Sequence, residues 1–218
     1  EKRDGKAIVK TLIIKDKPEN EYRGLMLDVS RHYFTVDEIK DLIENMAFLK
    51  LNKFHWHLSD DQGFRIESKL YPELTEIGAK RTSKHLKGFG LENDNVEEAR
   101  YYTQEEVKDI VAFADRLGVE VIPEIDIPGH TTAILASIPE LYCKSEPLDV
   151  MTSNGVSYGI LCAGNEKTFE FLDKLFGEIT PLFPSKKFHI GGDEAFNGYK
   201  VWDECEKCKA LKEKLGLK

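Results

Sequence analysis

The sequence alternates short apolar runs with longer segments of helical character, and this repetition constrains the fold more than any other feature. Each of four apolar runs is followed, directly or after a loop, by a segment with helical spacing or a helix-capping pattern. The predicted strands are residues 25–29, 53–58, 119–127 and 188–191, and the predicted helices are residues 35–51, 103–118, 167–182 and 199–215. Such strands are typical of a buried parallel sheet with crossover helices.

Capping signals support two of these helices. Thr35 with Glu38, and Thr103 with Glu106, have the spacing of a capping box. Gly118 stands where the second helix should end, since glycine readily adopts the left-handed conformation found there. The long stretch between the second strand and this helix, residues 60–102, is expected to be irregular.

Repeated β-then-α units indicate either an α/β barrel or a doubly wound sheet. A dinucleotide-binding sheet would carry GxGxxG after its first strand, and DVSR stands there instead. Polar residues stand at the end of every predicted strand or just after it: Asp28 and Arg31, Asp60 and Asp61, Asp126 and His130, and Asp193 and Glu194. In a barrel these ends converge on the face that carries the chemistry. We therefore predict an α/β fold of the (β/α)8 TIM-barrel type with only about the first four βα units present, because eight units need about 250 residues.

Composition excludes some classes of function. The net charge is −8, and no basic stripe is visible, so we expect no nucleic-acid partner. No apolar run approaches the ~18 residues of a membrane span. Four cysteines in 218 residues do not make a disulfide scaffold. The chain begins at Glu1 without a methionine or hydrophobic leader, so we expect either a mature chain or part of a longer one.

The run FHIGGDE at residues 188–194 carries the clearest chemical signal. Gly191 and Gly192 allow a sharp turn and a close approach of another group to the backbone. Asp193 and Glu194 then share a small volume, where like charges should raise one pKa and favour a general acid. An Asp-Glu pair without further context is more often part of a solvated loop. The two preceding glycines, together with the polar residues at the other strand ends, favour a catalytic acid here.

Other polar residues could bind a substrate. Arg31 could donate a fork of hydrogen bonds to sugar hydroxyls, or be a surface salt-bridge residue. Asp60 could bind a hydroxyl or orient the acid through His130, whereas Asp61 is interpreted as part of a capped turn. Two acids share a face of the third strand, and we expect them to be interior, hydrogen-bonded charges with a supporting role: Glu124 and Asp126.

Histidines and cysteines offer alternatives. His55 and His57 resemble a metal-binding His-x-His pair, but we favour core histidines bonded to neighbouring strands. Cys143 and Cys162 lie in the loop after the third strand and could form a disulfide that contributes about 3 kcal/mol. The pair formed by Cys205 and Cys208 is interpreted as structural, because two cysteines alone make a poor zinc site.

Five separated segments carry a family resemblance. They are YRGLMLDVSRHYF, LNKFHWHLSDDQGFR, GVEVIPEIDIPGH, LCAGNEKTFEFL and FHIGGDE. Together, and in this order, they resemble the family 20 glycoside hydrolases, the β-N-acetylhexosaminidases, over about residues 22–202. The resemblance implies a (β/α)8 barrel over residues 22–218, of which this chain is the first half, while residues 1–21 would be a linker or the tail of a preceding small α+β domain.

The resemblance also implies an activity, the removal of terminal β-linked N-acetylglucosamine or N-acetylgalactosamine with retention of configuration. Glu194 resembles the general acid/base and Asp193 the residue that grips the acetamido N–H. Arg31 resembles a residue that holds sugar hydroxyls, with Asp60 and His130 as partners near the acid. The substrate itself supplies the nucleophile in this family. We expect no cofactor and no metal ion.

The sequence departs from the family where the second half of the barrel should follow. Aromatic walls for the sugar, a tyrosine for the acetamide oxygen and acids for the outer hydroxyls are missing. We expect either a fragment of a longer enzyme or a second chain that completes the barrel, and we expect the fragment alone to be inactive. The alternatives are a metal-dependent barrel hydrolase using His55 and His57, or a non-catalytic carbohydrate-binding barrel. The sequence does not fix the compartment, but because glycans are met mostly outside the cytosol, an extracellular, cell-surface, lysosomal or periplasmic location is favoured over a cytoplasmic one.

Overall fold

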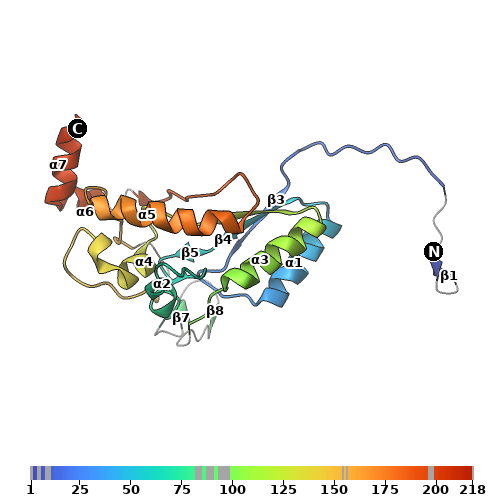
Figure 1. Cartoon of the computed structure of the whole chain (residues 1–218), viewed down its shortest axis with the longest axis horizontal. Coiled ribbons are helices and arrows are strands. Elements are labelled where there is room, and N and C mark those ends of the chain that lie inside the picture. Colours follow the sequence, from blue (N-terminus) through green and yellow to red (C-terminus); the bar gives the residue numbers. More distant parts are fainter. Residues whose placement is uncertain are drawn as a thin grey trace.

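Three parallel strands form the centre of the chain in its computed structural model (Figure 1). They are β3 (Gly24–Asp28), β4 (Lys53–His57) and β9 (Glu120–Glu124), in the order β3-β4-β9. These three strands thus lie in the order in which they occur in the sequence, as in a barrel. The structure describes residues 2–3, 6–7, 11–81, 85–86, 91–92, 99–153, 155, 157–195 and 199–217.

Three of the four predicted strands are confirmed, with shorter bounds. The fourth, residues 188–191, is wrong as a strand, because this segment makes only an isolated parallel bridge, between His189 and Glu124. The segment still runs beside β9 in the parallel direction, since Ile125 N donates to His189 O and Ile127 N to Ile190 O. Its residues therefore reach the same end of the sheet as the three strands.

The strand register aligns charged residues at that end. Asp28 pairs with His57, and His57 pairs with Glu124. Paired residues of a sheet point to the same face, so three titratable side chains stand in one row at the carboxyl ends of β3, β4 and β9. Two positions earlier, His55 points to the same face from β4.

Helices α1 (Val36–Phe48) and α3 (Gln104–Arg116) lie side by side, and α3 also packs on β9 (Figure 1). Both begin with the predicted capping boxes, at Thr35 and Thr103. Gly118 follows α3 with φ +74, as expected of a glycine at a helix end. Helix α5 (Glu166–Ile179) continues into η2 (Thr180–Leu182), which contacts α3.

The core consists of side chains from the sheet and from the buried faces of these helices. Its largest fully buried residues include Trp56, Phe54, Tyr102, Ile39, Ile43 and Ile110. Transfer of such side chains from water contributes about 1.5–3 kcal/mol each. This core fixes the strands whose ends carry the polar residues.

The stretch between β4 and α3 is more regular than predicted. Its elements are β5 (Ser59–Asp60), β6 (Gly63–Phe64), α2 (Glu73–Glu76), β7 (His85–Leu86) and β8 (Leu91–Glu92). Arg65 follows the β5–β6 hairpin, is fully buried, and donates to the backbone oxygens of Val29 and Ser30. This arginine therefore joins the hairpin to the loop after β3, where Arg31 lies.

Two short helices that the sequence analysis did not predict follow β9: α4 (Thr132–Ser137) and η1 (Pro139–Leu141). The predicted last helix is wrong as one element, because it is divided into α6 (Tyr199–Glu204) and α7 (Glu206–Lys214). The break is at Cys205, whose backbone is extended, with φ −83 and ψ 120.

Residues 11–20 extend away from the sheet (Figure 1). β1 (Lys2–Arg3) pairs with β2 (Lys6–Ala7). The apolar sequence of residues 7–15 also predicts a strand. This prediction is wrong over residues 11–15, which are exposed and form no strand, while residues 8–10 lie outside the described part of the chain. Of the helices described, none has the length and apolar character that crossing a membrane requires.

Candidate active site

Four of the five side chains predicted to act on a substrate form one line of contacts. Nη1 of Arg31 lies 2.7 Å from Oδ2 of Asp60, and Oδ1 of Asp60 lies 3.1 Å from Nδ1 of His130. On the other side of this ring, Nε2 of His130 lies 3.2 Å from Oε2 of Glu194. Segments far apart in the sequence thus meet at the carboxyl ends of the strands, the face where α/β barrels carry their chemistry.

Asp60, on β5, is the centre of this line and is buried. Its Oδ2 also lies 2.8 Å from Nε2 of His57. Burial opposes ionisation of the carboxyl group, but hydrogen bonds from His130 and His57 and the charge of Arg31 outweigh it and lower the pKa of Asp60 to about 2. Asp60 is therefore an anion that holds three cationic groups in place.

His57 continues the network into the sheet. Its Nδ1 lies 2.7 Å from Oε2 of Glu124, so both ring nitrogens face carboxylates. Burial lowers the pKa of His57, but the bonds to Asp60 and Glu124 outweigh burial and raise this pKa to about 10. His57 thus serves as a buried cation between two carboxylates.

Glu124 is shared by three imidazoles. Nε2 of His55 lies 2.6 Å from its Oε2, and Nδ1 of His189 lies 2.9 Å from its Oε1. Although burial has the opposite effect, the bonds from His55 and His57 lower the pKa of Glu124. These contacts fit the interpretation of His55 and His57 as histidines bonded to a neighbouring strand, and of Glu124 as an interior, hydrogen-bonded charge.

Metal-like groupings do occur here, and one joins His55, Glu124 and His189, whose ligand atoms lie within 4.8 Å of one another. Both oxygens of Glu124 are already bonded to imidazole nitrogens. His57 belongs to a different grouping, with Asp60 and Asp126. The alternative in which His55 and His57 share one metal ion therefore does not match either grouping.

Two carboxylates contact the same ring nitrogen of His130. Its Nδ1 contacts Asp60 and lies 3.3 Å from Oδ2 of Asp61. Hydrogen bonds to Asp60 and Asp61 raise the pKa of His130 to about 11 despite burial. Its backbone is in the left-handed region, with φ +53. The protonated ring thus presents Nε2 to Glu194.

Asp61 has a larger role than the sequence indicated. It lies in the β5–β6 turn as predicted, but its side chain is fully buried rather than a surface cap. Its Oδ1 accepts a hydrogen bond from the backbone N–H of Thr132 at 3.0 Å, at the start of α4. Asp61 and His57 are the site residues that sequence reasoning missed. The DD pair after β4 and the HWH pattern were the signals available, but neither indicates a partner.

The two glycines before the acid pair allow the close approach that was predicted. Gly191 has φ +64, and a Cβ there would lie 1.8 Å from Oδ1 of Asp126. The same oxygen accepts a hydrogen bond from the N–H of Gly192 at 3.1 Å. Asp126 is fully buried, and burial together with the charges of Asp193 and Asp60 raises its pKa to about 7.

Asp193 and Glu194 stand on this turn, exposed to solvent. Glu194 has φ +49, a conformation that a non-glycine residue rarely adopts and that directs its side chain toward His130. A carboxylate oxygen of Asp193 lies within 4.8 Å of ligand atoms of Asp126 and His130. All five predicted site residues therefore gather in one region. The raised pKa expected within the acid pair stays a prediction.

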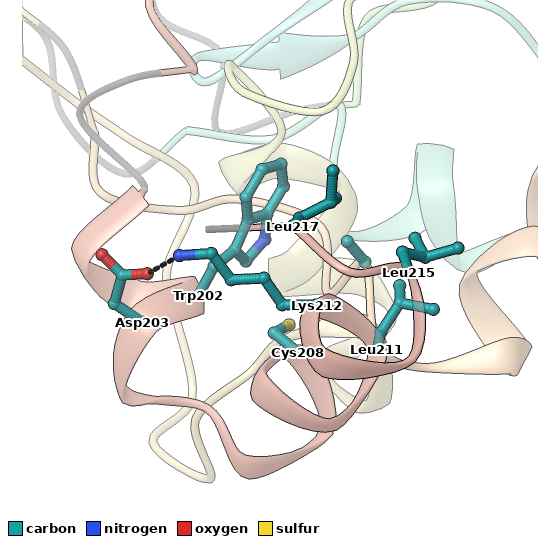
Figure 2. A pocket seen from close by; sticks show the side chains of 8 residues that line it. Trp202, Asp203, Cys208, Leu211, Lys212, Leu215 and Leu217 are labelled. Atoms are coloured by element: carbon teal, nitrogen blue, oxygen red, sulfur yellow. Dashed lines mark hydrogen bonds and ion pairs between the residues drawn. The ribbon is translucent and has the colours of Figure 1, made fainter.

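A large apolar pocket lies elsewhere, at the α6–α7 corner (Figure 2). It has a volume of about 440 Å³ and is lined by Ala163, Trp202, Asp203, Cys208, Leu211, Lys212, Leu215 and Leu217. Its one ion pair joins Lys212 and Asp203 at 3.1 Å. The pocket has no acid pair and does not include any residue of the network above.

The predicted disulfide is wrong. Cys143 and Cys162 do not form a disulfide, since all four cysteines of the chain are free. Cys205 and Cys208 lie beside them rather than forming a separate pair. Extended backbone at Cys205 makes this gathering possible, because it turns α7 toward the loop that holds Cys162.

A parallel sheet with crossover helices and an acid pair at its carboxyl ends defines this chain as part of a barrel-type hydrolase. Residues 20–218 match Glycosyl hydrolase family 20, catalytic domain, and the chain belongs to this family. Members of the family are glycoside hydrolases. The catalytic domains of the structural relatives are TIM barrels, and this chain corresponds to part of such a domain.

Two kinds of relative are informative. A β-hexosaminidase of Porphyromonas gingivalis is 44% identical over 205 residues, which are 94% of this chain and 25% of the relative. The structure of a Flavobacterium johnsoniae chitobiase is similar with a TM-score of 0.79 and 43% identity, over 92% of this chain and 28% of that one.

A second structure is an exo-β-N-acetylglucosaminidase from Vibrio harveyi in complex with N-acetylglucosamine. Its TM-score is 0.77 and its identity 40%, over 93% of this chain and 32% of that one. The chain thus spans between a quarter and a third of the length of these three relatives.

Proposed function

We propose that the protein containing this chain removes terminal β-linked N-acetylglucosamine or N-acetylgalactosamine from the non-reducing ends of glycans, with retention of configuration. Membership of the family and the sugar bound to the Vibrio harveyi relative support this substrate class. The observation that carries the proposal is the line of contacts from Arg31 through Asp60 and His130 to Glu194.

Glu194 is the general acid and base. It protonates the leaving oxygen and later activates water, a contribution of about 10²–10⁴-fold. His130 beside it is a cation fixed by Asp60 and Asp61, so it stabilises the carboxylate form whenever Glu194 has given up its proton. His130 and Asp60 are positioning residues in this scheme.

Asp193 grips the acetamido N–H of the substrate. No described residue donates a hydrogen bond to its carboxylate, which leaves the carboxylate open to a ligand donor. Asp193 adjoins Glu194 on one turn, so it is badly placed to be an enzymic nucleophile, which would sit on the opposite ring face about 5–5.5 Å from the acid. The acetamido oxygen of the substrate attacks C1 instead, and Asp193 stabilises the cyclic oxazolinium ion.

Neighbouring-group attack explains how one turn can serve both roles. Holding the acetamido oxygen next to C1 is worth up to about 7–11 kcal/mol as effective molarity. Stabilisation of the oxazolinium charge by Asp193 adds about 3–4 kcal/mol, by analogy with other preorganised sites. Proton transfer through Glu194 then suffices without a second catalytic carboxylate.

Arg31 holds sugar hydroxyls. Its Nη1 bonds to Asp28 and its Nε to Gln62, which fixes the plane of the guanidinium. Nη2 makes no hydrogen bond to any residue that the structure describes. That edge therefore offers donors to vicinal oxygens.

Substrate choice tests the mechanism. The complete enzyme should hydrolyse p-nitrophenyl N-acetyl-β-glucosaminide and be at least about 10²-fold slower on the matching 2-hydroxyl glucoside, because the latter lacks the nucleophile. Proton NMR of the first-formed product should show the β anomer. Equal rates on both substrates, or an α product, would rule the mechanism out.

The acid variant separates an enzyme from a binding protein. Glu194→Gln should lose about 10²–10⁴-fold in kcat and still bind N-acetylglucosamine in calorimetry. A non-catalytic carbohydrate-binding barrel would show no hydrolysis to lose in the parent protein. Chelator treatment tests the metal-dependent hydrolase. Activity that is lost while circular dichroism shows the fold unchanged, and that returns with added Zn²⁺, would support that alternative.

We further propose that residues 1–218 alone do not turn over substrate and that further βα units, from the same or a second chain, complete the site. Apolar side chains at the sheet support this, since Met26 and Ile190 are each 53% exposed. Release of p-nitrophenol by the pure 218-residue chain would refute the proposal.

A further inference from the structure

The four cysteines of the chain converge from three separate segments. Cys143 and Cys162 flank the ends of the loop after η1, and Cys205 and Cys208 lie at the start of α7. Their sulfur atoms all lie within 4.8 Å of one another. This cluster is separate from the main core and, within the part of the chain that the structure describes, packs against the partly buried Ala163 and Trp202.

The spacing of the sulfur atoms does not fit disulfides. Sγ of Cys208 lies 3.7 Å from that of Cys143 and 3.6 Å from that of Cys162, and Sγ of Cys162 lies 3.8 Å from that of Cys205. A disulfide joins its sulfurs at about 2.0 Å. Cys162 and Cys208, moreover, each have two sulfur neighbours at this distance. Disulfides would instead divide the four cysteines into two separate pairs.

The spacing does fit four ligands around one tetrahedral ion. With Zn–S bonds of about 2.3 Å, tetrahedral geometry places the sulfurs about 3.8 Å apart. The three distances above lie within about 0.2 Å of that value. Four sulfurs on the irons of a cubane cluster would be farther apart, because each thiolate there binds a different iron atom.

The surrounding backbone is also arranged as a metal site requires. The N–H of Gly164 donates to Sγ of Cys208 at 3.3 Å, the kind of supporting bond that orients a metal ligand. A Cβ at Gly164 would lie 2.2 Å from the carbonyl carbon of Lys207, so only glycine allows the loop to lie this close to α7. Three of the four cysteines are buried: Cys162, Cys205 and Cys208.

Helix α7 needs such a link. It is nine residues long, and Cys208 is its only buried residue within the described chain. Helices of this length are marginal without tertiary packing, and besides Cys208 only Leu211 and Lys212 of α7 line the pocket (Figure 2). A metal bound through Cys205 and Cys208 would supply the missing attachment.

We propose that Cys143, Cys162, Cys205 and Cys208 bind one structural Zn²⁺ ion that fixes α6 and α7 to the loop after η1. All four positions are filled by protein, as in closed structural sites, so the ion takes no part in the hydrolysis. The thiols release their protons to solvent on binding. The proposed ion does not contact the acid network. The proposal replaces the expectation that the chain binds no metal.

Metal analysis tests the proposal on the purified protein. Protein prepared with a thiol-free reductant and no chelator should contain about one Zn per chain by inductively coupled plasma mass spectrometry. Cys208→Ser should reduce this content at least about tenfold, since it removes one of four ligands. Ala210→Ser, on the exposed side of the same helix, is the matched control and should keep the zinc.

Cobalt provides a readout that does not depend on folding of the variant. Parent protein stripped of metal and refilled with Co²⁺ should show the intense visible bands of a tetrahedral thiolate site. Iron in place of zinc, four free thiols that bind neither Zn²⁺ nor Co²⁺, or a mass showing two disulfides would each overturn the proposal.

Discussion

Gly191 is the residue at which one methyl group should disable the acid pair. A Cβ would lie 1.8 Å from Oδ1 of Asp126, and φ is +64. Because Asp126 is buried and cannot move aside, the turn that carries Asp193 and Glu194 must shift instead. Gly191→Ala should lower kcat/KM of the complete enzyme by at least about 10²-fold, since a misplacement of about 1 Å has effects of that size. Hydrolysis of the p-nitrophenyl substrate measures it.

Gly177→Ala is the matched control for this change. Gly177 is an exposed residue within α5, and nothing lies within 4 Å of a Cβ built there. The variant should keep full activity and be about 0.5–1 kcal/mol more stable, because alanine loses less backbone freedom in a helix. If both variants retained activity, the close approach at Gly191 would not be what positions the acids.

Individual site residues could be predicted where a motif marks them, and not where only a partner does. Arg31, Asp60, His130 and the acid pair occur in segments that resemble a family. Asp61 was expected to cap a turn, because Asp before Gly is a turn signal. Its buried side chain accepts a hydrogen bond from Thr132, which lies 71 positions away in the sequence. No local sequence pattern indicates a contact over that distance.

Among the elements, the helices with capping boxes were the most predictable, because a capping box is a local interaction. Thr103 accepts from the N–H of Glu106, and the side chain of Glu106 accepts from the N–H of Thr103. Thr103→Ala should destabilise the protein by about 0.5–2 kcal/mol in urea unfolding. Thr103→Ser keeps the hydroxyl and should remain within about 0.5 kcal/mol of the parent. A loss in the serine variant equal to that in the alanine variant would assign the effect to the methyl group.

Elements set by distant contacts were predicted poorly. The sequence at residues 199–215 has helical spacing throughout, yet the helix breaks at Cys205, where the sulfur cluster draws the chain inward. Residues 188–191 have strand-like composition but form only a bridge to β9, because the glycines must turn over Asp126 instead of extending the ladder. In both places tertiary contacts override the local pattern.

At the scale of the molecule, the buried charges set how stability depends on pH. The pKa of Asp60 is lowered to about 2, so its contribution is present above its unfolded value near 4 and is lost as pH falls toward 2. The pKa values of His57 and His130 are raised to about 10 and about 11. Their contribution is complete below the unfolded value of about 6.5 and is lost as pH rises from there through 10 to 11.

Asp126 should lower the stability of the protein over a lower pH range than the two histidines do. Burial and two nearby carboxylates raise its pKa to about 7 from 3.8, so the folded protein holds a proton that the unfolded chain has released. The resulting contribution is complete below about pH 4 and is lost as pH rises through 7. Stability should therefore be greatest in the mildly acidic range, where Asp60 is ionised, Asp126 is protonated and both histidines are charged.

Asp126→Asn tests this assignment, because it keeps an oxygen for the N–H of Gly192 and removes the titration. Between pH 5 and pH 8 the parent should lose about 1–3 kcal/mol more unfolding free energy than the variant, at about 1.4 kcal/mol per pH unit for one proton. Urea unfolding at both pH values measures the difference. The decline that remains in the variant above pH 7 reports His57 and His130, since neither is altered. Parallel pH profiles for the two proteins would show that Asp126 does not hold the extra proton.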